Sequence, residues 1–169
     1  MNKKGRFNTG HKSKKGLYTP QNPEKYIGDL SEIMYMSSWE LKFMVYCDNR
    51  SEILRWGSEC FYVPYTMEKT DPKTGKLKIT NHKYWPDFYL EVVDPNSEEG
   101  FKKLLVEVKP EKETVMPKQP KKFSTKAMRN FEYALVAFEK NRYKWRKTVE
   151  FCKARDIEFK IITEKHLGL

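Results

Sequence analysis

The 169-residue chain has few of the residues that build disulfide frameworks, zinc sites or membrane spans. Its three cysteines, Cys47, Cys60 and Cys152, are far apart and outside any C-x-x-C pair, which indicates reduced thiols. Its three histidines are equally scattered, which argues against histidine-based catalysis and against a zinc centre. No signal peptide is recognisable, and no apolar run approaches the ~20 residues that a membrane span needs. We therefore expect a soluble protein that does not contact a membrane.

Acidic residues are absent from the first 16 positions, which nevertheless hold six cations. The net charge of the whole chain is +10, so this short stretch carries more than half of it. A basic excess of this kind is typical of proteins that bind a polyanion, most often nucleic acid, although a solubilising tail is the alternative. Because residues 1–22 contain few apolar side chains, we predict a flexible basic arm at 1–22 and one folded domain at 23–169.

The hydrophobic pattern predicts an α/β protein, with a mixed β-sheet and flanking helices. In chain order we expect a helix at 37–50, strands at 60–65, 84–93 and 101–109, a helical segment at 124–155 and a strand at 157–163. The segment at 124–155 is either one helix or two helices with a bend near Asn141. A long helical crossover returns a chain to a neighbouring parallel strand, so the last strand should join the same sheet.

Two carboxylates and an ammonium group are expected to meet at the edge of this apolar sheet. On a strand, Glu107 and Lys109 share one face, while the valines that alternate with them share the other. Asp87 follows Pro86 one strand earlier, and a hairpin would return the chain past it. An unpaired charge in such a place is costly to desolvate, and a divalent cation between Asp87 and Glu107 would satisfy both. This is the arrangement that metal-assisted phosphodiester cleavage requires.

The E-x-K pattern itself carries little weight, because the chain has three such triplets, at 40–42, 107–109 and 158–160. Only the second combines an apolar strand with a preceding Pro-Asp. The structural alternative for Asp87 is an ion pair with Lys83 or Lys109. For Glu107 and Lys109 it is a solvated strand face.

Glu40 has two competing interpretations. The sequence Ser37-Ser38-Trp39-Glu40 fits S-x-x-E, so Glu40 closes a capping box worth about 0.5–2 kcal/mol. Alternatively, it is a third carboxylate that reaches the metal site from the first helix. Residue chemistry alone favours the cap.

Five motifs in fixed order resemble the PD-(D/E)XK nuclease superfamily and, more narrowly, the head completion nuclease family of tailed bacteriophages. The resemblance runs from about residue 20 to the C-terminus. Relatives usually carry an Arg before the Ser-Ser-Trp-Glu element, where this chain has Met36, and the departure bears on a phosphate contact rather than on the metal site. The five motifs are Asn22-Pro23-Glu24-Lys25-Tyr26-Ile27-Gly28-Asp29, Ser37-Ser38-Trp39-Glu40, Trp85-Pro86-Asp87-Phe88, Val106-Glu107-Val108-Lys109-Pro110 and Asn141-Arg142-Tyr143-Lys144-Trp145.

The resemblance implies a restriction-endonuclease-like αβββαβ core that hydrolyses double-stranded DNA with little sequence specificity. It implies Mg²⁺ or Mn²⁺ as cofactor, and it changes Glu40 from a probable cap to an active-site carboxylate. The implied metal ligands are Asp87, Glu107, Glu40 and the Val108 carbonyl, and the implied catalytic groups are Glu40, Asp87, Glu107 and Lys109. It further implies that DNA is trimmed during head completion and head–tail joining, alongside head, portal and tail-joining proteins. The location would be the host cytoplasm during phage assembly, or the virion.

DNA contacts are expected mainly at the phosphate backbone, where they are independent of sequence and sensitive to salt. The candidates are Lys3, Lys4, Arg6, Lys12, Lys14, Lys15, Lys121, Lys122 and Lys126, and the resemblance adds Asn141 and Lys144. Two alternatives stay open at this point. One is a junction-resolving or transposition-type endonuclease. The other is a non-catalytic DNA-binding protein of the head–tail connector.

Overall fold

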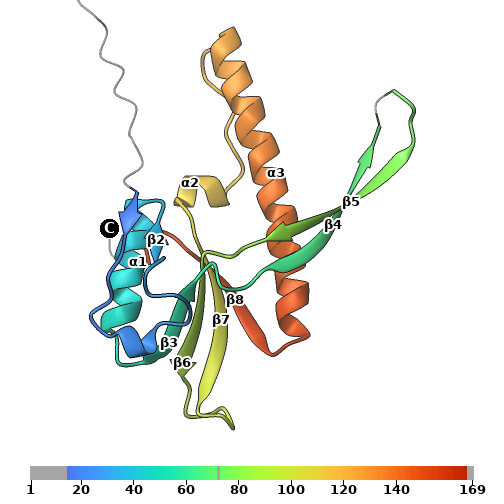
Figure 1. The fold of residues 1–169 in the computed structure, drawn as a ribbon. Coiled ribbons are helices and arrows are strands. Elements are labelled where there is room, and N and C mark those ends of the chain that lie inside the picture. Colours follow the sequence, from blue (N-terminus) through green and yellow to red (C-terminus); the bar gives the residue numbers. More distant parts are fainter. Residues whose placement is uncertain (1–14, 72, 167–169) are drawn as a thin grey trace, which may run out of the picture.

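A computed structural model describes residues 15–71 and 73–166, and it arranges them in three layers (Figure 1). The middle layer is a four-stranded sheet in the order β3-β6-β7-β8. Its strands are β3 (Ile53–Ser58), β6 (Phe88–Val93), β7 (Phe101–Val108) and β8 (Ile157–Ile162). The β3–β6 and β6–β7 pairs are antiparallel and β7–β8 is parallel, so the sheet is mixed as predicted.

Successive residues of a strand point to opposite faces, so both faces of this sheet have side chains to bury. One helix covers each face. Helix α1 (Ser38–Asn49) packs through Phe43 and Met44 on a cluster that includes Val106 and Val108 of β7. Helix α3 (Thr125–Lys153) packs on a second cluster that includes Leu105, from the opposite face of the same strand. The α3 face is the one to which Glu107 and Lys109 belong.

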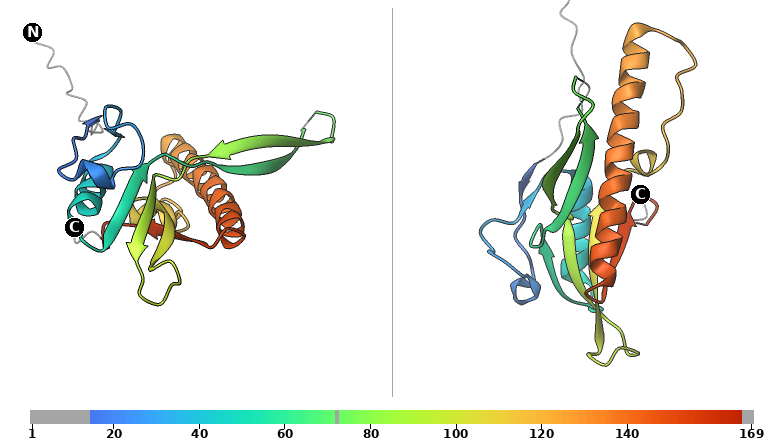
Figure 2. Two further views of the ribbon diagram at one scale, coloured as in Figure 1. Left: turned by 60° about the horizontal axis from the view of Figure 1, so that its bottom comes forward. Right: turned by 90° about the vertical axis from the view of Figure 1, so that its right-hand side faces the viewer.

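The sequence predicts a strand of the central sheet at 60–65, and this prediction is wrong. The first sheet strand is β3, which sequence reasoning missed, and residues 59–62 are irregular. From Val63 the chain forms an antiparallel hairpin of β4 (Val63–Thr70) and β5 (Leu77–Tyr84), which is a separate two-stranded sheet that projects from the body (Figures 1 and 2). The predicted strand at 84–93 is likewise divided, because Tyr84 ends β5 and β6 begins only at Phe88.

The described part of the predicted arm is held against α1. Asp48, which is fully buried, accepts hydrogen bonds from the Tyr18 hydroxyl (2.8 Å) and from the Asn22 backbone N–H (3.0 Å). Lys25 donates to three backbone carbonyls at the C-terminal end of α1, at distances of 2.8 to 3.1 Å. We call residues 15–35 the N-terminal strap; it contains β1 (Gly16–Leu17), the 3-10 helix Pro23–Lys25 and β2 (Met34–Tyr35).

The segment at 124–155 is a single helix, α3, and its first half extends beyond the sheet (Figures 1 and 2). The Ser124 side chain caps its N-terminus by accepting a hydrogen bond from the Ala127 N–H (3.2 Å). A short helix, α2 (Glu111–Thr114), lies in the connection from β7 to α3. No helix in the described ranges is long and apolar enough to cross a membrane.

Candidate active site

The register of β6 and β7 brings Asp87 and Glu107 to the same end of the sheet. Phe88 pairs with Val106, so the two carboxylates lie one residue beyond the last paired positions of their strands. Asp87 is anchored there, because its Oδ2 accepts a hydrogen bond from the Val108 backbone N–H at 2.7 Å. Neighbouring antiparallel strands therefore place two carboxylates side by side.

Glu107 is almost completely enclosed, with 1% of its surface exposed. Its Oε1 lies 3.2 Å from the Lys109 ammonium, and its Oε2 accepts a hydrogen bond from the Tyr84 hydroxyl. Tyr84 is the last residue of β5, so the hairpin contributes directly to the site. Sequence reasoning did not assign a role to Tyr84. Tyr84 ends β5 and Glu107 lies on β7, and no local sequence pattern links residues that far apart in the chain.

The charges in this group do not balance. Burial raises the pKa of Asp87 to about 7, and the neighbouring charge of Glu107 adds to the effect. The Lys109 ammonium and the Val108 N–H counteract the rise only in part. Burial also lowers the pKa of Lys109, but the carboxylates outweigh it and the net shift of that pKa is upward. With Asp87 ionised, two carboxylates lie beside the Lys109 ammonium. Glu40 adds a third negative charge nearby, and Lys144 on α3 adds a second positive one, so the site carries excess negative charge.

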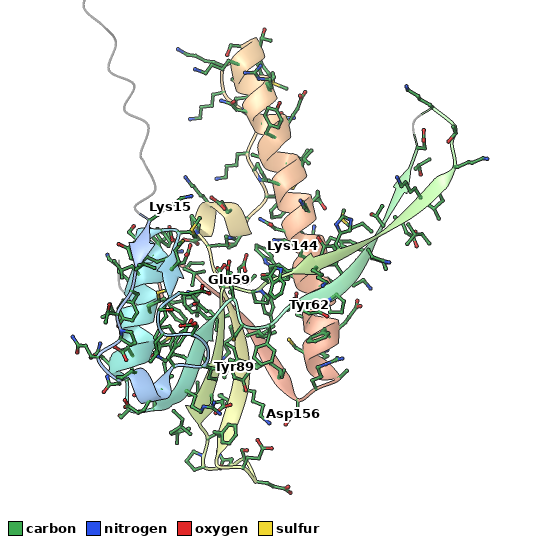
Figure 3. All side chains as sticks on the ribbon, viewed as in Figure 1. Lys15, Glu59, Tyr62, Tyr89, Lys144 and Asp156 are labelled. Carbon is green, nitrogen blue, oxygen red and sulfur yellow. The ribbon has the colours of Figure 1, made fainter. Side chains whose placement is uncertain are left out.

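Lys144 belongs to α3 (Figure 3) and is close enough to Glu107 and Asp87 for their charges to act on its pKa. Its Nζ lies 4.3 Å from the centre of the Tyr84 ring, a cation–π contact. Burial and the positive charge of Lys109 lower the pKa of Lys144, against the opposing effect of Glu107. Asn141 lies one turn earlier on α3 and is partly buried, but at about 100° per residue it is turned roughly 60° from Lys144.

Glu40 forms the capping box that residue chemistry favours. The Glu40 N–H donates to the Ser37 Oγ (3.1 Å), while the two Glu40 carboxylate oxygens accept from the Ser37 hydroxyl (2.9 Å) and from the Met36 N–H (2.7 Å). Its negative charge nevertheless contributes to the raised pKa of Asp87. Glu40 is therefore at the margin of the carboxylate group, with its side chain held at the start of α1.

The other candidate DNA contacts are spread over the surface. Lys15 is exposed at the start of the N-terminal strap, and Lys121, Lys122 and Lys126 are exposed around the start of α3. Five further candidates lie outside the described residues: Lys3, Lys4, Arg6, Lys12 and Lys14.

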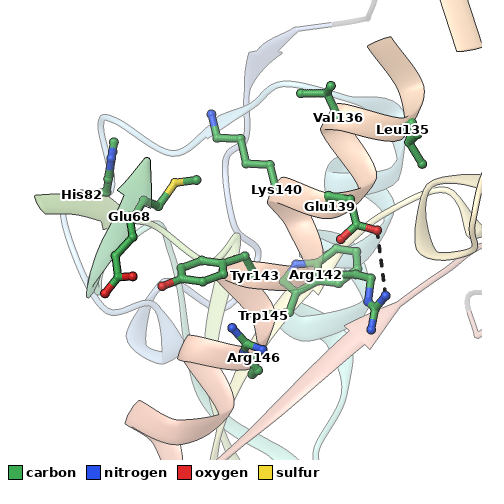
Figure 4. A pocket seen from close by; sticks show the side chains of 11 residues that line it. Glu68, His82, Leu135, Val136, Glu139, Lys140, Arg142, Tyr143, Trp145 and Arg146 are labelled. Atoms are coloured by element: carbon green, nitrogen blue, oxygen red, sulfur yellow. Dashed lines mark ion pairs between the residues drawn. The ribbon is translucent and has the colours of Figure 1, made fainter. Parts of the chain in front are cut away.

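A groove of about 1170 Å³ separates the hairpin from α3 (Figure 4). Met67 and His82 line it from the hairpin, and Val136, Lys140 and Tyr143 line it from α3. The catalytic candidates on β6 and β7 do not contribute to its wall. The groove and the carboxylate group are thus neighbouring but separate features.

In residues 15–71 and 73–166, no group of three His, Cys, Asp or Glu side chains converges as a ready-made metal site. The donor set at the sheet edge is a pair of carboxylates, Asp87 and Glu107. Such a pair suits an ion that takes oxygen ligands and keeps several of its waters.

Known proteins with similar sequences identify the family of this chain. The profile of the family described as "TnsA-like endonuclease N terminal" matches residues 50–164, which contain both carboxylates and Lys109. The chain belongs to this endonuclease family. The chain is also similar to the "Head completion nuclease" of Enterobacteria phage T4. That relative is 32% identical over 152 residues, which are 90% of this chain and 92% of the relative. The resemblance to head completion nucleases and to the PD-(D/E)XK type is therefore confirmed. No solved structure matches the chain.

Proposed function

We propose that this endonuclease-family protein is a metal-dependent DNA nuclease with a restriction-endonuclease-like core. The observation that carries the proposal is the pairing of Asp87 with buried Glu107, 3.2 Å from Lys109, at one end of two antiparallel strands. The order α1, β3, β6, β7, α3 and β8 supports the αβββαβ description, with the β4–β5 hairpin inserted after its first strand.

The paired carboxylates fit a divalent cation such as Mg²⁺ or Mn²⁺. The raised pKa of Asp87 means that the ionised pair is unfavourable by itself, and a bound cation would offset that cost. Asp87 and Glu107 would hold the ion directly, with the Val108 carbonyl as a further ligand. Glu40 would reach it through water, because both of its carboxylate oxygens are engaged in the cap. When bound, such an ion polarises a phosphate and acidifies a water molecule.

The protein side chains then position the substrate and balance charge. Lys109 is held by Glu107 and keeps its proton, since its pKa is raised, so it offsets negative charge that develops on the phosphate. Tyr84 keeps the Glu107 carboxylate in place through its hydroxyl. Lys144, with a lowered pKa and one side against the Tyr84 ring, would contact the scissile strand, and Asn141, one turn earlier on α3, would add a second contact.

The biological role we propose is the trimming of packaged double-stranded DNA during phage head completion and head–tail joining. The homologous head completion nuclease of phage T4 supports this role. Head, portal and tail-joining proteins would be the partners. The protein would act in the host cytoplasm during assembly, or within the virion.

The test is cleavage of supercoiled plasmid by the purified protein with Mg²⁺, with Mn²⁺ and with EDTA, comparing wild type with Lys109→Ala. The matched control is Lys160→Ala, which removes the lysine of another E-x-K pair on an exposed strand, where Lys160 lies 3.3 Å from Glu158. We expect metal-dependent nicking by wild type and by the control, and none by Lys109→Ala.

Two results would contradict the proposal. Nicking that survives Lys109→Ala would place the chemistry elsewhere. Wild-type protein that binds DNA but cleaves it with neither metal would favour a non-catalytic head–tail connector.

A further inference from the structure

The first half of α3 is a helix with little to pack against. It extends beyond the sheet (Figure 1). Most of its side chains between 125 and 137 are exposed. Tyr133 is 68% exposed, which is high for an aromatic residue in the middle of a helix. A surface of this kind points to contact with something outside the chain.

Four of the eight cations of α3 follow one line. At about 100° per residue, Lys126 lies five complete turns before Lys144 and so on the same face. Lys140 and Arg129 are within about 60° of that direction, on the same side of it, and Tyr133 points between Lys144 and Lys140. We call the line formed by Lys126, Arg129, Lys140 and Lys144 the α3 track. It runs about 27 Å along the helix and ends at the carboxylate group.

The acidic residues of α3 lie to one side of the track. All three, Glu132, Glu139 and Glu150, point about 120–140° away from Lys144, and Glu132 is about 60° from Arg129. On the opposite face, Arg142 pairs with Glu139 at 4.0 Å. Among the described residues, Lys126, Arg129 and Lys140 have no ion-pair partner. The track therefore presents uncompensated positive charge, whereas the back of the same helix is partly neutralised.

The spacing along the track suits a rigid polyanion. Two cations lie near the outer end and two near the carboxylate group, about 16 Å apart along the axis between Arg129 and Lys140. The two acids of the stretch between them, Glu132 and Glu139, point at least about 80° away from Lys140. The stretch is long enough to span a major groove of about 12 Å. A straight rod with charge at both ends matches duplex DNA, whose two backbones flank that groove.

We infer that the α3 track is the surface along which duplex DNA lies, and that it leads the phosphate backbone to Asp87 and Glu107. This inference rests on the proposed nuclease function and assigns Arg129, Tyr133 and Lys140 to DNA contact. Lys144, already placed beside the Tyr84 ring, is the inner end of the track. Contacts are to phosphates, so they carry no sequence preference.

The experiment measures how the affinity for duplex DNA depends on salt. Fluorescence anisotropy with a labelled duplex of about 20 base pairs, in EDTA to prevent cleavage, is recorded over a range of NaCl concentrations. The track variant is Lys126→Gln/Arg129→Gln/Lys140→Gln. The control is Lys153→Gln/Arg155→Gln/Lys160→Gln, which removes the same charge from exposed positions at and beyond the C-terminal end of α3, away from the track. Circular dichroism verifies that each variant is folded.

We expect the slope of log affinity against log salt to become less steep by about 2 to 3 in the track variant, with a 10- to 500-fold loss of affinity near 0.1 M salt. The control should stay close to wild type. An unchanged slope in the track variant, or an equal loss in the control, overturns the inference. If RNA binds more tightly than duplex DNA and only RNA binding depends on the track, the assignment to duplex DNA is wrong.

Failure of the proposed nuclease function would give a different result from failure of the track. Track-dependent DNA binding without cleavage in any metal would refute the nuclease function and leave the track intact.

Discussion

Replacing Asp87 with Asn should make the metal-free protein more stable at pH 8. The folded protein holds the pKa of Asp87 at about 7, against 3.8 for the free side chain. Each pKa unit corresponds to about 1.4 kcal/mol, so the ionised Asp87 lowers stability by about 4 kcal/mol at most. Asp87 is partly exposed, so we expect about 2–3 kcal/mol after solvent screening. An Asn keeps an oxygen for the Val108 N–H and removes the repulsion from Glu107.

The stability gained by Asp87→Asn should depend on pH. A carboxylate whose pKa is raised in the folded state keeps its proton while the unfolded chain loses it, so wild-type stability falls between about pH 4 and pH 7. The advantage of Asp87→Asn should therefore be full at pH 8 and nearly absent at pH 4. In thermal unfolding with EDTA at pH 8, it corresponds to a rise in Tm of about 4–12 °C.

The control is Asp94→Asn, a partly exposed aspartate that also accepts a backbone N–H, from Asn96 at 3.0 Å. It should change stability by less than about 0.5 kcal/mol. Adding Mg²⁺ or Mn²⁺ at pH 8 should stabilise wild type and have no such effect on Asp87→Asn. If Asp87→Asn is no more stable than wild type at pH 8, then ionising Asp87 does not destabilise the folded protein. The argument for a cation between the carboxylates would then lose its basis.

Two further substitutions test contacts away from Asp87. Tyr84→Phe should lower the free energy of unfolding by about 1.5–3 kcal/mol, because it removes a hydrogen bond to the buried Glu107 carboxylate. The control in urea unfolding is Tyr62→Phe, which changes a half-exposed ring. Equal stability of the two variants would contradict the reasoning. Asp48→Ala should cost about 2–4 kcal/mol and increase hydrogen exchange in the N-terminal strap; unchanged exchange there would show that Asp48 does not hold it. Burial raises the pKa of Asp48, but its hydrogen bonds outweigh that effect and the net shift is downward, so this stability should be present above the usual aspartate pKa and be lost as the pH falls below it.

The sequence predicts the long helices and the sheet's centre, and it fails where the chain leaves the sheet. Strand β3 was missed because its register shifts between Ile53 and Arg55, which interrupts the alternation of apolar and polar residues. The β4–β5 hairpin was missed because both faces of its outer part are exposed, so no hydrophobic period marks it. The residues at 60–65 alternate like a strand, but 60–62 are irregular and 63–65 open β4 of that hairpin rather than a strand of the central sheet.

The grouping of Asp87, Glu107 and Lys109 could be predicted because it depends only on the period of a strand and on one hairpin. The contact between Tyr84 and Glu107 could not, since it depends on the angle at which the inserted hairpin leaves the body. The track on α3 depends on how far the helix extends beyond the sheet. Helical spacing shows which cations share a face, but only the three-dimensional arrangement shows that this face is exposed and leads to the carboxylates.

The parallel pairing of β7 with β8 has a consequence for the order of folding. Strands β3, β6 and β7 are joined by antiparallel pairings, whereas β8 can dock only after the whole of α3 has been laid across the sheet. Contacts between distant parts of a chain form slowly. The carboxylate-bearing strands should therefore assemble first, with the outer edge of β7 open to wrong partners until β8 arrives. A chaperone, or DNA already bound to the nascent protein, would have its greatest effect during that interval.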